Sequence, residues 1–161
     1  MILIKWLNRY LEESILVILS VFTVVIIFTQ VVMRYVFSNS LPWSEEIARY
    51  AFVWMIYIGV SYGVKKKKHL SVDVFSELLD YKGKLVLGII ANSFFLIFAL
   101  VISYFGVDIV AKITRESAAM RLPMSWVYAA PLVGMILTSI RLLQNIWLLI
   151  KSFYKENSSN T

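Results

Sequence analysis

Length, composition and charge place this chain among integral membrane proteins. It has 161 residues, 60% of them hydrophobic, and a mean hydropathy of +0.75, whereas soluble domains carry about 45–50% apolar residues. Cysteine is absent, which excludes disulfides, thiolate metal sites and a cysteine nucleophile. The net charge of +6 does not indicate nucleic-acid binding, because the basic residues stand at the ends of apolar segments, where membrane topology explains them.

The apolar residues form four long blocks, which predict an all-α integral membrane protein with one four-helix domain over 1–151. A span needs about 20 mostly apolar residues to cross a hydrocarbon core of about 30 Å. A signal peptide is the alternative for the first block, but its length and the absence of a small-residue cleavage site favour a retained helix. The predicted transmembrane helices cover residues 14–36, 42–64, 85–111 and 123–150.

Three shorter segments lie outside these spans. Residues 1–10 alternate in polarity at helical spacing, which predicts a short amphipathic helix lying in the membrane interface. Residues 69–84 are polar with one apolar side, and we expect them to form a short cytoplasmic connecting helix. The polar tail over 152–161 has few apolar residues and is expected to be disordered.

The distribution of Lys and Arg predicts the orientation. Pro42 and the acidic residues after it suit a helix N-terminus, and the lysines that follow residue 64 suit a C-terminus. Ten basic residues fall on one side of the predicted spans and five on the other, which puts both termini in the cytoplasm by the positive-inside rule. The cytoplasmic set is Lys5, Arg9, Lys65, Lys66, Lys67, Lys68, Lys82, Lys84, Lys151 and Lys155; the outer set is Arg34, Arg49, Lys112, Arg115 and Arg121.

Polar side chains gather at the predicted outer ends of the first two helices. Thr23, Gln30 and Arg34 share one face of the first helix, and Glu45 and Arg49 are spaced for an i, i+4 ion pair. Two interpretations stay open: a charged platform that docks a partner, or an interfacial cluster that only anchors helix ends. The candidate residues are Arg34, Trp43, Glu45, Glu46, Arg49, Arg115 and Arg121.

Small residues predict close helix packing at two places. Gly59 and Gly63 form a G-x-x-x-G pattern in the second helix, and Ala130, Gly134 and Thr138 form a similar stripe in the fourth. The stripes serve either a subunit interface or packing within the four-helix unit. The fourth helix also contains Pro131, which is expected to kink it.

Arg141, His69 and Asp73 are candidates for contacts on the cytoplasmic side. Arg141 is either a deep charge or a side chain that reaches the headgroups, and the second interpretation is favoured. His69 and Asp73 are spaced for a local hydrogen bond or a contact with a neighbouring subunit, and they are too few for a metal site. No catalytic, cofactor or metal site is predicted, and with no deeply buried acid the chain suits an accessory subunit better than a transporter acting alone.

Several motifs together resemble one family. They are Arg34-Tyr35-Val36-Phe37, Leu41-Pro42-Trp43-Ser44-Glu45-Glu46, Trp54, Gly59, His69-Leu70-Ser71-Val72-Asp73 and Leu122-Pro123-Met124-Ser125-Trp126-Val127-Tyr128 with Pro131 and Gly134. This order resembles the small membrane subunit, the Q or DctQ-like subunit, of tripartite ATP-independent periplasmic (TRAP) transporters. The four lysines before His69 are more charge than the pattern leads us to expect there.

The resemblance implies a subunit of the bacterial inner membrane that binds no substrate itself. Its implied partners are a large membrane subunit, which carries the substrate and sodium sites and moves by an elevator motion, and a periplasmic protein that delivers an organic acid such as sialic acid or a C4-dicarboxylate. The small subunit would enlarge the scaffold of the large one and help to dock the periplasmic protein.

Two alternatives come from other classes of protein. A small four-helix homodimeric exporter needs an acid within a helix, whereas Glu12 and Glu13 lie at the edge of the first span. A membrane anchor of a redox or other multi-subunit complex is disfavoured by the single histidine and the absence of cysteine.

Overall fold

The described residues form four long helices. The computed structural model describes residues 2–66 and 80–159. Its elements are α1 (Ile2–Tyr35), α2 (Pro42–Lys65), α4 (Tyr81–Lys112) and α5 (Ser125–Ser159). Each is long and apolar enough to cross a membrane. The predicted all-α fold with four membrane-spanning helices is therefore confirmed.

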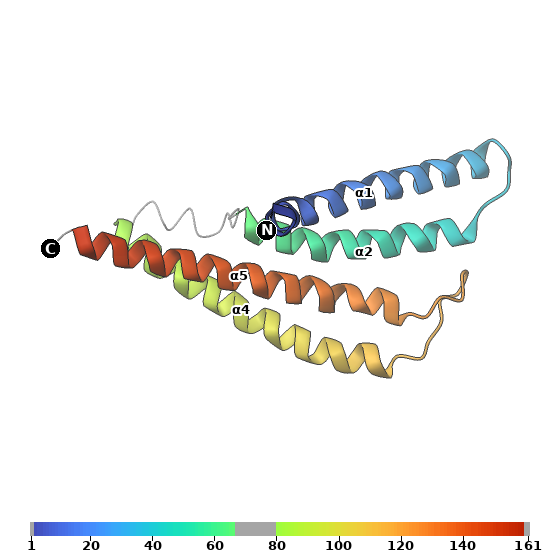
Figure 1. Cartoon of the computed structure of the whole chain (residues 1–161). Coiled ribbons are helices and arrows are strands. Elements are labelled where there is room, and N and C mark those ends of the chain that lie inside the picture. Colours follow the sequence, from blue (N-terminus) through green and yellow to red (C-terminus); the bar gives the residue numbers. More distant parts are fainter. Residues whose placement is uncertain (1, 67–79, 160–161) are drawn as a thin grey trace.

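The helices lie side by side in the order α1, α2, α5, α4 (Figure 1). The backbone of α1 approaches only α2, and that of α4 approaches only α5, while α2 and α5 pack on each other. Because α1 and α2 form one hairpin and α4 and α5 another, the central helices α2 and α5 run in the same direction. We call the end with the 36–41 and 113–124 connections the loop end.

Burial follows this order. In the most apolar 18-residue stretch of each helix, 11% of the residues are buried in α1 and in α4, against 28% in α2 and 39% in α5. A cluster of buried apolar side chains lies where α2, α4 and α5 meet and consists of Val64, Ala99, Met135 and Leu142. The two outer helices therefore turn most of their apolar side chains away from the rest of the chain.

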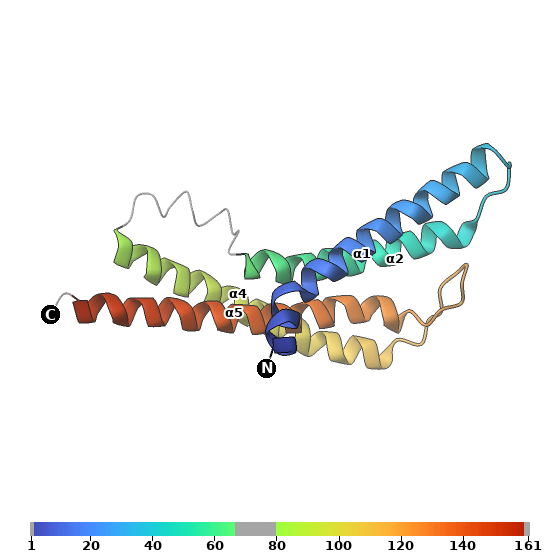
Figure 2. The same ribbon diagram turned by 45° about the horizontal axis from the view of Figure 1, so that its top comes forward.

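The separate interfacial helix expected over 1–10 is not confirmed. Residues Ile2–Tyr35 form one continuous helix, because no Gly or Pro interrupts the sequence before or after Glu12. The first turns of α1 nevertheless change direction: they are seen nearly end-on in Figure 1 and lie across the row in Figure 2.

The tail was also expected to be disordered, and this prediction is wrong as far as Ser159. No Gly or Pro follows Ile150, so α5 continues to that residue. It also runs through Pro131 as one helix. Most of the expected connecting helix over 69–84 lies outside the described residues, and its last four positions belong to α4.

Candidate functional site

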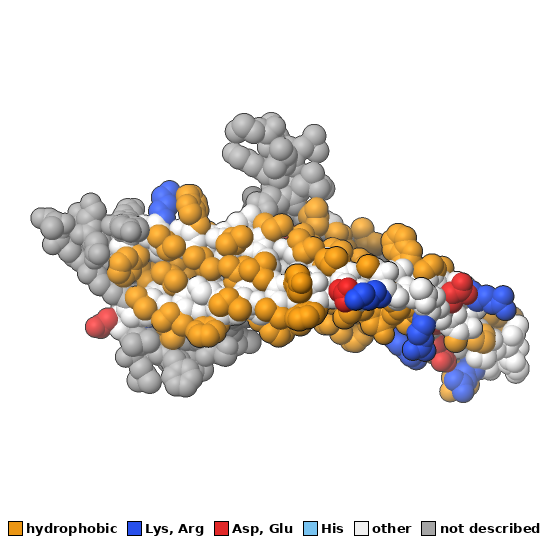
Figure 3. Space-filling view, turned by 90° about the horizontal axis from the view of Figure 1, so that it is seen from below, with side chains coloured by type: hydrophobic (Ala, Val, Ile, Leu, Met, Phe, Trp, Pro, Cys, Tyr) orange, Lys and Arg blue, Asp and Glu red, His pale blue; other side chains and the backbone are white. Residues whose placement is uncertain are grey.

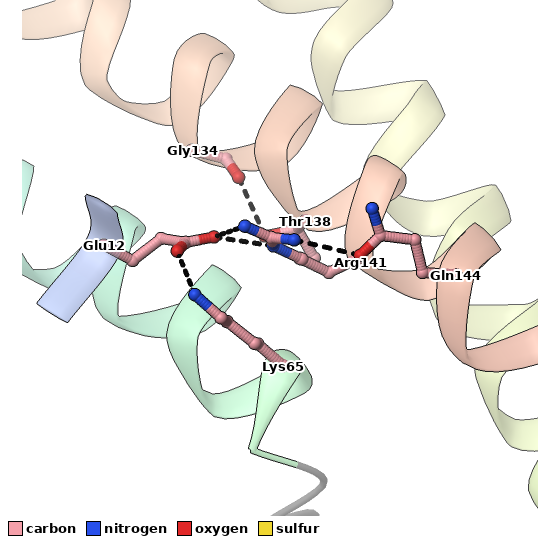
Figure 4. A network of polar contacts seen from close by, with 6 residues as sticks. All are labelled: Glu12, Lys65, Gly134, Thr138, Arg141 and Gln144. Atoms are coloured by element: carbon pink, nitrogen blue, oxygen red, sulfur yellow. Dashed lines mark hydrogen bonds and ion pairs between the residues drawn. The ribbon is translucent and has the colours of Figure 1, made fainter. Parts of the chain in front are cut away.

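Three charged side chains from three helices meet inside the chain (Figure 4). Glu12 of α1 accepts hydrogen bonds from Lys65 of α2, with Nζ 2.6 Å from Oε2, and from Arg141 of α5, with Nε and Nη2 each 2.6 Å from Oε1. The Glu12 side chain is 0% exposed, that of Arg141 9% and that of Lys65 17%. We call these three residues the charge cluster. It connects α1 to α5 across α2 at the end of α2 opposite the loop end.

Amide and hydroxyl groups extend the charge cluster along α5. Arg141 Nη1 donates to Gln144 Oε1 at 2.9 Å, and Asn145 Nδ2 donates to the Val64 carbonyl at the end of α2 at 2.9 Å. Thr138, one turn before Arg141, donates a hydrogen bond from its hydroxyl to the Gly134 carbonyl at 2.7 Å. The α2–α5 contact is therefore lined with polar groups near the end of α2.

The charge cluster overturns two expectations from the sequence. Arg141 does not extend its side chain to the surface, because the carboxylate of Glu12 neutralises it inside the chain. The chain does contain a deeply buried acid, and that acid is Glu12. Removing a charge from water is costly unless an opposite charge and hydrogen bonds compensate, and two cations supply that compensation. An acid held in this way joins helices together and is not free to exchange ions.

Gln30 organises the connection between α1 and α2 at the loop end. Its Oε1 accepts the Leu41 backbone N–H at 3.1 Å and lies 2.6 Å from the buried Ser44 hydroxyl. Its Nε2 lies 3.3 Å from both Ser40 Oγ and Glu45 Oε1. Gln30 is itself buried, so it serves as an internal cap for the start of α2.

Glu46 holds the second connection of the loop end. Its Oε2 accepts the backbone N–H groups of Ala119 and Met120 at 3.0 and 3.1 Å, and Tyr50 donates its hydroxyl proton to Oε1. The 113–124 connection folds back on itself through the Ser117–Leu122 and Arg115–Met124 backbone hydrogen bonds. Glu46 therefore fixes the tip of this connection on α2.

The remaining residues of the predicted outer cluster lie on the surface of the loop end, where charged side chains gather in Figure 3. The expected Glu45–Arg49 ion pair does not form, because Glu45 turns towards Gln30. Among the side chains that the structure describes, those of residues 10–66, 80 and 83–153, the ion pairs are Glu12–Lys65, Glu12–Arg141 and Asp108–Lys112. The exposed members of the predicted cluster are Arg34, Trp43, Glu45, Arg49, Arg115 and Arg121.

The glycine stripes differ in how closely they pack. A Cβ on Gly134 would lie 2.6 Å from Tyr57 Cβ and 2.8 Å from the Tyr57 carbonyl oxygen, so α5 and α2 touch backbone to backbone there. A Cβ on Gly59 would meet only Leu16 at 3.9 Å, and one on Gly63 nothing within 4 Å. The stripe with the buried residues Ala130 and Gly134 serves packing inside the chain, whereas Gly63 faces open space.

Two predicted residues, His69 and Asp73, lie outside the described residues. Within the part of the chain that the structure describes, no three His, Cys, Asp or Glu side chains lie close enough to share a metal ion. Glu12 is the residue that the sequence interpretation missed. The sequence did contain a signal for it: Glu12 is an acid beside one apolar run, and Arg141 is a single basic residue within another, so the two could have been predicted to pair.

Fold and site together define a multi-pass helical membrane protein whose buried charges connect its own helices. The chain belongs to the family described as "Tripartite ATP-independent periplasmic transporters, DctQ component", whose profile matches residues 23–152. It is thus a TRAP transporter small permease subunit.

Relatives with known names agree with this assignment. The chain is 30% identical over 131 residues to a Haemophilus influenzae protein named as a TRAP transporter small permease, covering 81% of this chain and 79% of the relative. It is 27% identical over 148 residues to the C4-dicarboxylate TRAP transporter small permease protein DctQ of Vibrio cholerae, covering 76% and 64%. It is also 27% identical over 153 residues to the isethionate TRAP transporter permease protein DctMQ of Oleidesulfovibrio alaskensis, covering 89% of this chain and 24% of the relative.

Proposed function

We propose that this chain is the non-catalytic scaffold subunit of a TRAP transporter that imports an organic acid with sodium across the bacterial inner membrane. It enlarges the static part of a large elevator-type membrane subunit, and its loop end helps to dock a periplasmic substrate-binding protein. The observation that carries the proposal is the single row of helices, in which the backbones of α1 and α4 each approach that of only one neighbour. Such a row leaves broad apolar faces for a larger membrane partner and for lipid.

The names of the relatives support a large membrane partner and an anionic substrate. The Oleidesulfovibrio alaskensis relative is named DctMQ and is about four times as long as its matching part, which covers 24% of it. The relatives are named for a C4-dicarboxylate, isethionate and sialic acid, which are all organic acids. We therefore propose an organic acid as the class of substrate, without choosing among the three.

We propose that the loop end faces the periplasm and both termini face the cytoplasm. The ten-to-five distribution of basic residues in the sequence supports this orientation. The exposed residues Arg34, Arg49, Arg115 and Arg121 make no ion pair within the described residues. Their guanidinium groups are available to carboxylates of a docking protein, which Arg can bind with two parallel hydrogen bonds.

Co-purification and reconstituted uptake test the scaffold role. We expect the chain to purify with the large membrane subunit in mild detergent. Proteoliposomes that hold both subunits should take up the organic acid when a sodium gradient and the periplasmic protein are supplied. Liposomes with this chain alone should take up none. Uptake by this chain alone, or a large subunit that is fully active without it, would overturn the proposal.

Charge reversal tests docking separately from assembly. The substitutions Arg49→Glu and Arg115→Glu should reduce uptake while leaving co-purification intact, because both side chains are exposed and outside the described ion pairs. Lys84→Glu changes the same charge on an exposed side chain near the opposite end and is the matched control. Equal uptake in all three variants would leave the loop end as a simple helix anchor.

A further inference from the structure

One face of α5 is open along most of its length. It carries the apolar side chains Val133, Ile136, Ile140, Leu143, Trp147 and Ile150, whose exposed fractions range from 37% to 63%. Near its end, Leu143, Gln144, Trp147 and Leu148 line a shallow groove of about 460 Å³. An apolar face on a membrane helix fits lipid as well as protein, so the face alone does not identify what covers it.

Gln144 distinguishes this face. Arginine has only donors, so the Gln144 side chain must turn its carbonyl oxygen towards Arg141 Nη1, at 2.9 Å. That contact fixes the orientation of the amide, and Figure 4 shows its nitrogen pointing away from Arg141. Arg141 is in turn held by Glu12. The charge cluster therefore presents one N–H₂ group at the surface of α5.

The other amide side chains of the four candidate spans are used inside the chain. Gln30 Nε2 lies near Ser40 and Glu45, Asn92 Nδ2 donates to the Gly88 carbonyl at 2.7 Å, and Asn145 Nδ2 donates to the Val64 carbonyl. Among the four amide side chains of the candidate spans that the structure describes, Gln144 is the one whose nitrogen has no hydrogen-bond acceptor. An unsatisfied donor at membrane depth is costly, and lipid tails offer no acceptor.

We infer that the Gln144 face of α5 is the docking surface for a membrane helix of the large subunit. Leu143, Trp147 and Leu148 receive its apolar side chains, and Gln144 Nε2 donates to an oxygen of that helix. Polar side chains stabilise contacts between membrane helices in this way, and aromatic residues are enriched at interfaces. This inference rests on the proposed scaffold function and adds the surface through which it acts.

The outer helices present no such amide at their surface, because Gln30 of α1 and Asn92 of α4 are used inside the chain. On α1 the Thr29 hydroxyl donates to the Val25 carbonyl of the same helix, and on α4 the Ser103 hydroxyl donates to the Ala99 carbonyl, each at 2.8 Å. These faces carry side chains such as Phe28 and Phe94, which are 68% and 71% exposed. We assign them to lipid.

Photo-crosslinking tests the assignment in the assembled complex. A benzophenone amino acid replaces Trp147, which is 63% exposed, or, as matched controls, Phe28 of α1 or Phe94 of α4. Irradiation of membranes that hold both subunits should join the chain to the large subunit from position 147 and from neither control. Products from position 28 or 94 without one from 147, or only lipid adducts at 147, would overturn the inference.

A pair of amide substitutions tests the role of the donor. Gln144→Leu should weaken the complex roughly three- to fifteenfold, the range expected for one interhelical hydrogen bond in a membrane. Asn92→Leu removes an amide that bonds its own helix and should leave the complex unchanged. The thermal unfolding of each variant without the large subunit shows whether folding is preserved. Equal loss in both variants, or none in either, would contradict a role of Gln144 in docking.

These results separate the two proposals. If the chain and the large subunit do not co-purify at all, the scaffold function fails. If they co-purify and transport but position 147 gives no product with the large subunit, only the surface assignment fails.

Discussion

The two ends of the α2–α5 pair are each fixed by one glutamate, but by different means. Opposite the loop end, Glu12 is buried between the side chains of Lys65 and Arg141. At the loop end, Glu46 accepts backbone N–H groups from the connection between α4 and α5. The first contact joins three helices, whereas the second holds one loop. A buried acid in this membrane chain therefore indicates how the helices are assembled, and the substitutions below separate the two roles.

Glu12→Gln should give the largest effect, because it removes the buried carboxylate charge that both Arg141 and Lys65 bind. Removing one partner of a buried ion pair costs about 3–5 kcal/mol. We expect the free energy of unfolding, measured in mixed detergent micelles, to fall by about that amount. Glu13→Gln changes the neighbouring residue, which takes part in none of the described ion pairs, and is the control.

A double substitution sharpens this test. Replacing Glu12 and Arg141 together by leucine removes both opposite charges, and buried pairs replaced by apolar residues are often no less stable. We expect the double variant to recover much of the stability that Glu12→Gln loses, although Lys65 stays charged. If both variants unfold like the parent chain, the charge cluster does not join the helices.

Gly134→Ala should give the next largest effect. The added methyl would lie 2.6 Å from Tyr57 Cβ and close to the Tyr57 backbone, so α2 and α5 would have to separate. Overpacking of this kind costs about 1–3 kcal/mol. Gly63→Ala, with nothing within 4 Å, gains the same helix propensity without the clash and is the matched control. The difference between the unfolding free energies of the two variants measures the cost of the clash with Tyr57. Equal values would show that α2 and α5 are not in close contact at Gly134.

The sequence was sufficient for the fold class but not for the site. Apolar blocks of about 20 residues predict membrane helices, because hydrocarbon demands them. Residues 12, 65 and 141 each stand beside or inside a different apolar block, so each can be interpreted alone as an interfacial charge. Their meeting depends on the parallel α2–α5 contact and on the packing of α1 against α2, and neither is encoded in local spacing.

At the loop end, too, local sequence spacing does not predict which side chains meet. The spacing of Glu45 and Arg49 predicts an ion pair, but the buried Gln30 draws Glu45 towards α1 instead. The anchor interpretation applies to Glu46, which binds the chain's own loop. The docking interpretation stays open for the exposed arginines, which are available to a partner.

Glu46→Gln should act locally. The amides of Ala119 and Met120 lose a charged acceptor, so we expect their hydrogen exchange to become several-fold faster, while amides in the middle of α2 and α5 exchange as before. Glu45→Gln removes a charge from the adjacent residue, which does not contact this loop, and should leave both amides unchanged. Faster exchange throughout the chain would mean that Glu46, like Glu12, supports the whole fold.

Lys112→Ala should give the smallest effect, although its ion pair looks as good as the buried ones. Lys112 Nζ lies 2.7 Å from Asp108, against 2.6 Å for the contacts of Glu12, but the two side chains are 75% and 58% exposed. Such exposed i, i+4 pairs contribute about 0.3–0.5 kcal/mol, because water and salt screen them and side-chain entropy opposes them. We therefore expect a change of at most about 0.5 kcal/mol in the unfolding free energy, shrinking further as salt is added. A loss comparable to that of Glu12→Gln would mean that distance, and not burial, decides the strength of ion pairs in this protein.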